Sequence, residues 1–219
     1  MDSFSLNHLV FLLEGVLWTV VLSGLAFVLG SLAGFGVMLL RTARSAWLRR
    51  VSFAYVQVIQ GLPLLILLFC VYFGLGVVGI ELSPLVAAAL SLMIYCSAFL
   101  GEIWRGCVEA VPRTQSEAAE CLALSRWQVL VDVVLPQAAR IAVPPTVGFF
   151  VQVLKSTSLA SVVGFVELTR ASQLINNSVF QPFLVFGLAG CLYFALCYPL
   201  SRWSRRLERR LNVGRRQPA

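Results

Sequence analysis

The chain has 219 residues, of which 59% are hydrophobic and only 12% are charged, and its formal net charge is +7 at pH 7. A soluble domain has about 45–50% apolar and about 25% charged residues, so this composition excludes one and indicates a polytopic membrane protein. The positive charge does not indicate nucleic-acid binding, because the arginines flank apolar segments instead of covering a polar domain. The six cysteines have no metal-ligand spacing, so we expect neither a metal site nor a disulfide framework.

Five apolar segments are long enough to span a bilayer, which requires about 20 helical residues. We expect spans at about residues 9–40, 53–77, 85–104, 141–166 and 183–200, within a single transmembrane domain over residues 1–219. Gly61 and Pro63 interrupt the second span and predict a bend there. The first span carries a stripe of small residues, which predicts close packing against another helix. The members of the stripe are Gly24, Gly30, Gly34 and Gly36.

The arginines are distributed unevenly among the segments between spans, and this distribution predicts the orientation. Four arginines follow the first span, four follow the third and seven follow the fifth, whereas the segment between the fourth and fifth spans, 167–182, contains only Arg170. Arginine is in excess on the cytoplasmic side of membrane proteins. We therefore expect the N-terminus outside the cell and the C-terminus in the cytoplasm, with 167–182 as a polar outer segment.

The segment 114–136, which we call the hairpin, separates the third and fourth spans. We expect it to form two short helices, at about 115–124 and 126–135, the second of which ends at Pro136. From residue spacing alone, the hairpin suits a simple connector and a docking surface for a partner protein equally well.

Both hairpin helices begin with the spacing of a capping box, in which a hydroxyl and a longer polar side chain satisfy free amides. The pairs are Thr114 with Glu117 and Ser125 with Gln128. In the first helix, the small side chains of Ala118 and Ala119 are expected to form a surface that a partner can approach closely.

Six sequence blocks, in this order along the chain, resemble the polar amino acid branch of importer-type ABC transporter permeases. They are Gly61-x-Pro63-Leu64-Leu65, Tyr72-Phe73-Gly74-Leu75, Glu102-x-x-Arg105-Gly106, Leu135-Pro136-Gln137-Ala138, Pro144-Pro145 and Lys155-x-Thr157-Ser158-Leu159. Glu117-Ala118-Ala119 resembles the EAA motif of the same family. The resemblance covers about residues 15–211. It implies an all-α membrane protein with the five-helix type I ABC importer permease fold and a cytoplasmic coupling-helix hairpin.

The resemblance implies that the hairpin docks on a cytoplasmic ATPase. The residues expected to take part are Glu117, Ala118, Ala119, Leu122 and Ala123. The family usually has glycine where this chain has Ala123, and an alanine in a left-handed conformation costs about 1–2 kcal/mol.

The same resemblance implies a subunit of the bacterial inner membrane that forms the translocation path for an amino acid or a related small polar solute. The expected partners are an ATP-binding cassette ATPase dimer, a second permease subunit (with a heterodimer favoured), an extracytoplasmic substrate-binding protein and membrane lipid. ATP would be bound by the partner, because a P-loop requires Gly-Lys-Ser/Thr and the one lysine of this chain follows Leu154. We expect no cofactor in this chain.

Lys155, the only lysine, lies about 21 Å along the fourth span and therefore within the bilayer. An ionisable residue at such a depth usually faces a cavity or a partner, although it can also snorkel to the surface. Ser156, Thr157 or Ser158 is expected to cap a new half-helix, whose positive end suits a carboxylate. In the family, the matching block lines the translocation path, with aspartate in place of Ser156. We add Glu102, from the third block, to these predicted path residues.

Two other functions compete with transport by an ABC importer. A Ser–Lys dyad of Lys155 with Ser156 or Ser158 would suit an intramembrane enzyme, but no accompanying motif supports it, and we expect no catalytic residue. An ATPase-independent channel or secondary carrier is the remaining alternative, although such a protein would not require the hairpin.

Overall fold

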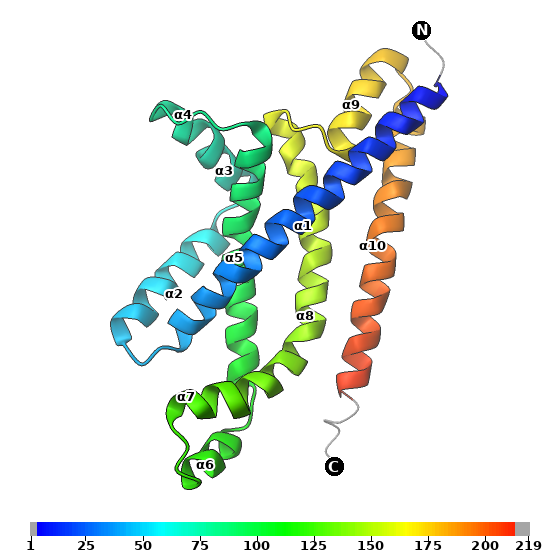
Figure 1. Ribbon diagram of the computed structural model, residues 1–219. Helices are drawn as coiled ribbons and strands as arrows, with labels where there is room; N and C mark the ends of the chain where they lie inside the picture. Colours follow the sequence, from blue (N-terminus) through cyan, green and yellow to red (C-terminus); the bar gives the residue numbers. More distant parts are fainter. Residues whose placement is uncertain (1–3, 213–219) are drawn as a thin grey trace.

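The protein is entirely helical over the residues that the structure, a computed structural model, describes, which are 4–212 (Figure 1). The α-helices are α1 (Leu6–Thr42), α2 (Ala46–Gly61), α3 (Leu64–Phe69), α4 (Leu75–Val77), α5 (Pro84–Glu109), α6 (Arg113–Cys121), α7 (Arg126–Gln128), α8 (Leu135–Ser156), α9 (Leu168–Val179) and α10 (Pro182–Asn212). Two π-helical segments, Cys70–Gly74 and Val129–Val134, and a 3-10 helix, Thr157–Val163, join some of these helices without a break. The predicted all-α fold class is confirmed.

Four helical stretches within 4–212 are long and apolar enough to cross a membrane, and a bent pair of helices provides a fifth. The four are α1, α5, α10 and the continuous stretch from α7 to the 3-10 helix, Arg126–Val163. The fifth consists of α2 and the stretch Leu64–Val77, with a bend of 104° between them. The bend lies at Gly61 and Pro63, as the sequence predicts. In Figure 1, α6 and α7 lie at the opposite end of the molecule from α9 and the N-terminal end of α1.

Small residues bring α1 and α5 into close contact along the middle of the molecule. A Cβ atom added at Gly30 would collide with the Cβ atom of Cys96, and one added at Gly34 would lie 3.1 Å from a backbone oxygen of α5. Gly24 and Gly36, by contrast, have no atoms within 4 Å of such a position. Half of the predicted glycine stripe therefore serves the packing of α1 against α5, and the other half faces open space.

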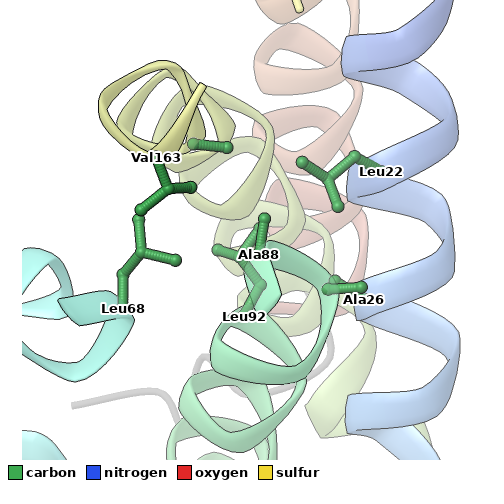
Figure 2. Close-up of a cluster of buried hydrophobic side chains, with 8 residues drawn as sticks. Leu22, Ala26, Leu68, Ala88, Leu92 and Val163 are labelled. Carbon is green, nitrogen blue, oxygen red and sulfur yellow. The ribbon is translucent and has the colours of Figure 1, made fainter. Parts of the chain in front are cut away.

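A buried apolar cluster connects segments that are far apart in the sequence, and Figure 2 shows its members pointing toward one another. The residues that the figure labels are Leu22 and Ala26 of α1, Leu68 of α3, Ala88 and Leu92 of α5, and Val163 of the 3-10 helix. The cluster holds the second half of the bent span against α5 and the end of the fourth span. Its packing supports the bend, which on its own breaks the backbone hydrogen bonds of a helix.

Two local expectations require correction or extension. Pro136 does not end a helix: the π-helical segment Val129–Val134 runs directly into α8, and Pro136 is its second residue. Pro136 lies inside a continuous helical run, so its missing N–H removes one hydrogen bond to the preceding turn, and the wider π turn before it accommodates the ring. The polar segment 167–182 contains an amphipathic helix, α9, whose apolar side packs against α1 and α10. Arg215 and Arg216 of the predicted tail lie outside the described residues.

We predict that Gly30→Ala destabilises the protein, because the added methyl group would collide with α5. Overpacking of this kind costs about 1–3 kcal/mol, which should lower the Tm of the purified protein in detergent by several degrees. Gly24→Ala is the matched control, because it adds the same methyl group to the same helix in open space. Its Tm should stay unchanged or rise, since alanine favours helix more than glycine does. Equal shifts for both variants would contradict the close contact of α1 and α5.

Candidate functional site

The two hairpin helices begin in different ways. Ser125 caps α7 as predicted: its N–H and hydroxyl donate to Oε1 of Gln128 at 2.8 and 2.7 Å, and its Oγ accepts from the Gln128 N–H at 3.4 Å. The capping box predicted for Thr114 and Glu117 does not form, because α6 begins earlier, directly after Pro112, without a side-chain cap. Proline is well suited to that position, since its fixed φ angle leads into the first turn of a helix.

The turn between α6 and α7 contains a left-handed alanine. Ala123 has φ of 58°, and its N–H donates to the carbonyl of Glu120 at 2.9 Å. The N–H of Leu124 then donates to the carbonyl of Ala119 at 3.3 Å, which closes the end of α6. This is the conformation that glycine adopts most easily at a helix end, and alanine adopts it here at a cost of about 1–2 kcal/mol.

The predicted docking residues of α6 lie on two different faces of the helix. Ala119 is only 5% exposed and belongs to a buried cluster formed by the hairpin, the end of α5 and the start of α8. Leu122 is 76% exposed, and Glu117 and Ala118 are also exposed. The expectation that Ala119 forms part of an accessible surface therefore requires correction: its small side chain lets α6 pack closely on the hairpin core, while Glu117, Ala118 and Leu122 face outward.

The end of the fourth span differs from the expectation that a new half-helix begins there. After α8, the chain continues as a 3-10 helix, and its hydroxyl groups bond backward to the preceding turn. Thr157, which is fully buried, donates to the carbonyl of Leu154 at 2.8 Å, and Ser158 donates to the carbonyl of Lys155 at 2.8 Å. Because no helix starts at this point, it lacks the positive helix end that was expected to attract a carboxylate.

The predicted path residues lie in two separate places. Lys155 is exposed on α8, and its side chain makes no hydrogen bond or ion pair with another described residue. Glu102 lies near the other end of the membrane-spanning region. Trp104, which is close to Glu102 on α5, donates to the hydroxyl of Thr146 on α8 at 2.8 Å, so Glu102 lies near the level of Thr146. Lys155 lies about 14 Å further along α8 than Thr146. The structure therefore does not bring Glu102 and Lys155 together.

Glu102 belongs to a chain of ion pairs at the C-terminal ends of α1 and α5. Its carboxylate accepts two hydrogen bonds from Arg41, both at 3.2 Å, and two from Arg105, at 3.0 and 2.7 Å. Arg105 also pairs with Glu109 one turn further along α5. The Arg41 guanidinium lies 5.0 Å from the ring centroid of Phe53, which brings α2 to the same place. This set joins three helices through alternating charges and a cation–π contact.

A buried carboxylate near the start of α9 was missed by sequence reasoning. Glu167 is fully buried and accepts hydrogen bonds from the N–H groups of Thr169 and Arg170, both at 2.9 Å, and from the hydroxyl of Tyr193 at 2.7 Å. Burial raises the pKa of Glu167, and the hydrogen bonds that it accepts oppose this shift. The sequence does contain a signal for a helix-capping role, because Glu167 directly precedes a segment whose apolar residues have helical spacing. Glu167 ties the start of α9 to α10.

Within residues 4–212, no group of three or more histidine, cysteine, aspartate or glutamate side chains could hold a metal ion. The arrangement of the described residues instead offers an exposed helix face on the hairpin, an unpaired lysine on the fourth span, and an ion-pair chain between them.

Comparison with known proteins gives consistent matches over nearly the whole chain. A family model described as binding-protein-dependent transport system inner membrane component matches residues 11–213. A probable glutamine ABC transporter permease protein of Bacillus subtilis (strain 168) is 39% identical over 211 residues, which cover 94% of this chain and 96% of the relative. The glutamine transport system permease protein of Escherichia coli (strain K12) is 35% identical over 209 residues, with coverage of 92% and 93%. A crystal structure of an amino acid ABC transporter with histidines superposes with a TM-score of 0.89 at 29% identity, covering 96% of this chain and 100% of that chain.

We predict that Ala123→Gly stabilises the protein, because glycine adopts the left-handed conformation without the steric cost that alanine bears. The gain should be about 1 kcal/mol, measured as a rise in Tm. Ala118→Gly is the control: the same change within α6, which is right-handed helix, should cost about 1 kcal/mol. A loss of stability in both variants would contradict the left-handed turn.

Proposed function

The chain belongs to the family of binding-protein-dependent transport system inner membrane components, and we propose that it is the permease subunit of an ABC importer for an amino acid. The relatives match over more than nine tenths of both chains, and the fold agrees with that of a solved amino acid ABC transporter. An ATPase-independent channel or carrier is not favoured, because it would leave the exposed face of the hairpin without a purpose. The relatives and the solved structure are named for glutamine and histidine, so we propose a polar amino acid and no single one.

The energy for transport is proposed to come from a separate ATPase dimer that docks on the hairpin and binds ATP. The outward face of α6 supports this, because Ala118 allows close approach and Leu122 offers an apolar anchor at 76% exposure. Ala119 contributes from within, by holding α6 on the hairpin core. An extracytoplasmic binding protein would deliver the substrate to the opposite end of the molecule.

Lys155 is proposed to face the translocation path, where its own positive charge, without help from a helix end, would attract the carboxylate of the substrate. The support is its place on α8 without an acidic partner in the described part of the chain, since an unpaired charge at this depth costs about 2.5–3.5 kcal/mol. The buried Thr157 and the hydroxyls of Ser156 and Ser158 shape the same end of the span. With Ser156 in place of an acid, a heterodimer whose second subunit supplies that acid is the favoured assembly. Glu102 would act at the inner end, through its ion pairs.

We propose that the protein lies in the bacterial inner membrane, with its N-terminus outside and its C-terminus in the cytoplasm. The excess of arginine at the ends of α1, α5 and α10 supports this orientation. It places the hairpin on the side where ATP is available.

Replacing Ala118 with tryptophan should block the docking of the ATPase, because the large ring would fill the close-contact face of α6. We expect binding of the copurifying ATPase to weaken about tenfold or more, which corresponds to about 1.4 kcal/mol. ATP-driven uptake in vesicles should be lost, while the Tm of the chain stays unchanged. Arg44→Trp, in the loop after α1, is the control with the same new side chain and should bind and transport normally. Normal ATPase binding by Ala118→Trp would remove the basis for the docking assignment.

The orientation can be tested with single cysteines in a cysteine-free background. A cysteine at Asn177, which is exposed on α9, should react with a membrane-impermeant maleimide in intact cells. A cysteine at Ser116 on α6 should react only after the cells are opened. The opposite labelling pattern would reverse the proposed topology.

A further inference from the structure

We infer that the inner ends of α1, α2 and α5 form a binding site for the headgroup of an anionic phospholipid. The site is a cavity of about 370 Å³ whose charged wall carries four arginines and one glutamate. The lining consists of Arg41, Ala46, Arg49, Arg50, Phe53, Arg105 and Glu109. The inference rests on the proposed function only in that this end of the molecule is taken to face the cytoplasm.

The charges around the cavity do not cancel. Four guanidinium groups face two carboxylates, Glu109 and the adjoining Glu102. Arg41 and Arg105 are already engaged by these carboxylates. Two positive charges are therefore left over, those of Arg49 and Arg50, and an anionic group in the cavity would neutralise them.

The two remaining arginines differ in their freedom to bind a ligand. Arg49 uses Nη1 to donate to the carbonyls of Ala43 and Arg44, at 2.9 and 2.8 Å, and so secures the loop after α1. Arg50 is exposed, and no described residue forms a hydrogen bond or ion pair with its side chain. Arg50 is thus the guanidinium that is free to bind a phosphate, with Arg49 beside it.

The surroundings favour a lipid over a soluble anion. The cavity is lined by Phe53 of α2, which is 47% exposed, and Trp47, which follows the lining residue Ala46 in the chain, is 69% exposed. Aromatic side chains of this kind gather at the level of the lipid headgroups, and basic pockets between membrane helices on the cytoplasmic side bind anionic headgroups. A phosphate in the cavity would carry its acyl chains directly onto this apolar face of α2.

The site also adjoins the hairpin. Arg105 and Glu109 are in the last turns of α5, directly before the short loop that leads into α6. A bound headgroup would hold the ends of α1, α2 and α5 together at the base of the proposed docking element. Binding should therefore be visible as stabilisation of the folded protein.

The test is a titration of the purified full-length protein in detergent, with Tm as the readout. Dioleoyl-phosphatidylglycerol should raise the Tm more than dioleoyl-phosphatidylcholine does. Arg50→Gln should require about fivefold more phosphatidylglycerol for the same shift, the effect expected from one arginine at a headgroup. Arg44→Gln is the matched control, because Arg44 is exposed in the loop directly before α2 but does not line the cavity. It should titrate like the unmodified protein.

Three outcomes would overturn the inference. Equal weakening by Arg44→Gln and Arg50→Gln would show a diffuse attraction to the basic surface. An equal rise in Tm with inorganic phosphate would show a site for free anions instead of lipid. The absence of any difference between the two lipids in the unmodified protein would show that no headgroup is selected. None of these outcomes depends on transport, so a failure of the lipid site is distinguishable from a failure of the proposed function.

Discussion

The close approach of α1 to α5 at Gly30 and Gly34 is the contact on which the rest of the structure depends. Helices surrounded by lipid gain little from burying apolar surface against one another, so their association relies on tight packing and on polar contacts. Here the glycines allow the tight packing, and polar contacts secure α1 at two further points. Near its C-terminal end, Arg41 of α1 pairs with Glu102 of α5 at 3.2 Å. In its N-terminal half, the hydroxyl of Thr19 accepts from the first N–H of α9 at 3.2 Å.

The fourth span connects the hairpin mechanically to the opposite end of the molecule, where α9 lies (Figure 1). The helical run Arg126–Val163 passes without a break through a π-helical segment, Pro136 and the 3-10 helix. The hairpin packs on the start of α8 through the cluster that contains Ala119, and the end of the 3-10 helix packs in the cluster of Figure 2. A displacement of the hairpin would therefore move the whole span, including Lys155, because no loop interrupts it to absorb the motion.

Sequence reasoning succeeded where structure is decided locally and failed where it depends on distant neighbours. The spans, the bend at Pro63 and the cap at Ser125 follow from hydropathy, the missing N–H of proline and the reach of a serine hydroxyl. The expected half-helix after Lys155 was wrong because serine and threonine hydroxyls can also bond back to their own helix. The burial of Ala119 and Glu167 depends on which helices pack against them, and their spacing in the sequence does not contain that information.

The role proposed for Lys155 requires an assembly larger than one chain. A lysine exposed on a membrane-spanning helix must reach water, a counter-charge or a ligand, because its desolvation is unfavourable. The described part of this chain offers it no acidic partner, and the hydroxyls of Thr157 and Ser158 are committed to backbone carbonyls. Under the proposed role, the charge is satisfied from beyond the described residues, by a second subunit, by water in a shared path or by the solute. In an assembly of two such subunits, the side of α8 that carries Lys155 would face the space between them. A water-filled path between the two subunits would then solvate the charge of Lys155 and also carry a polar solute.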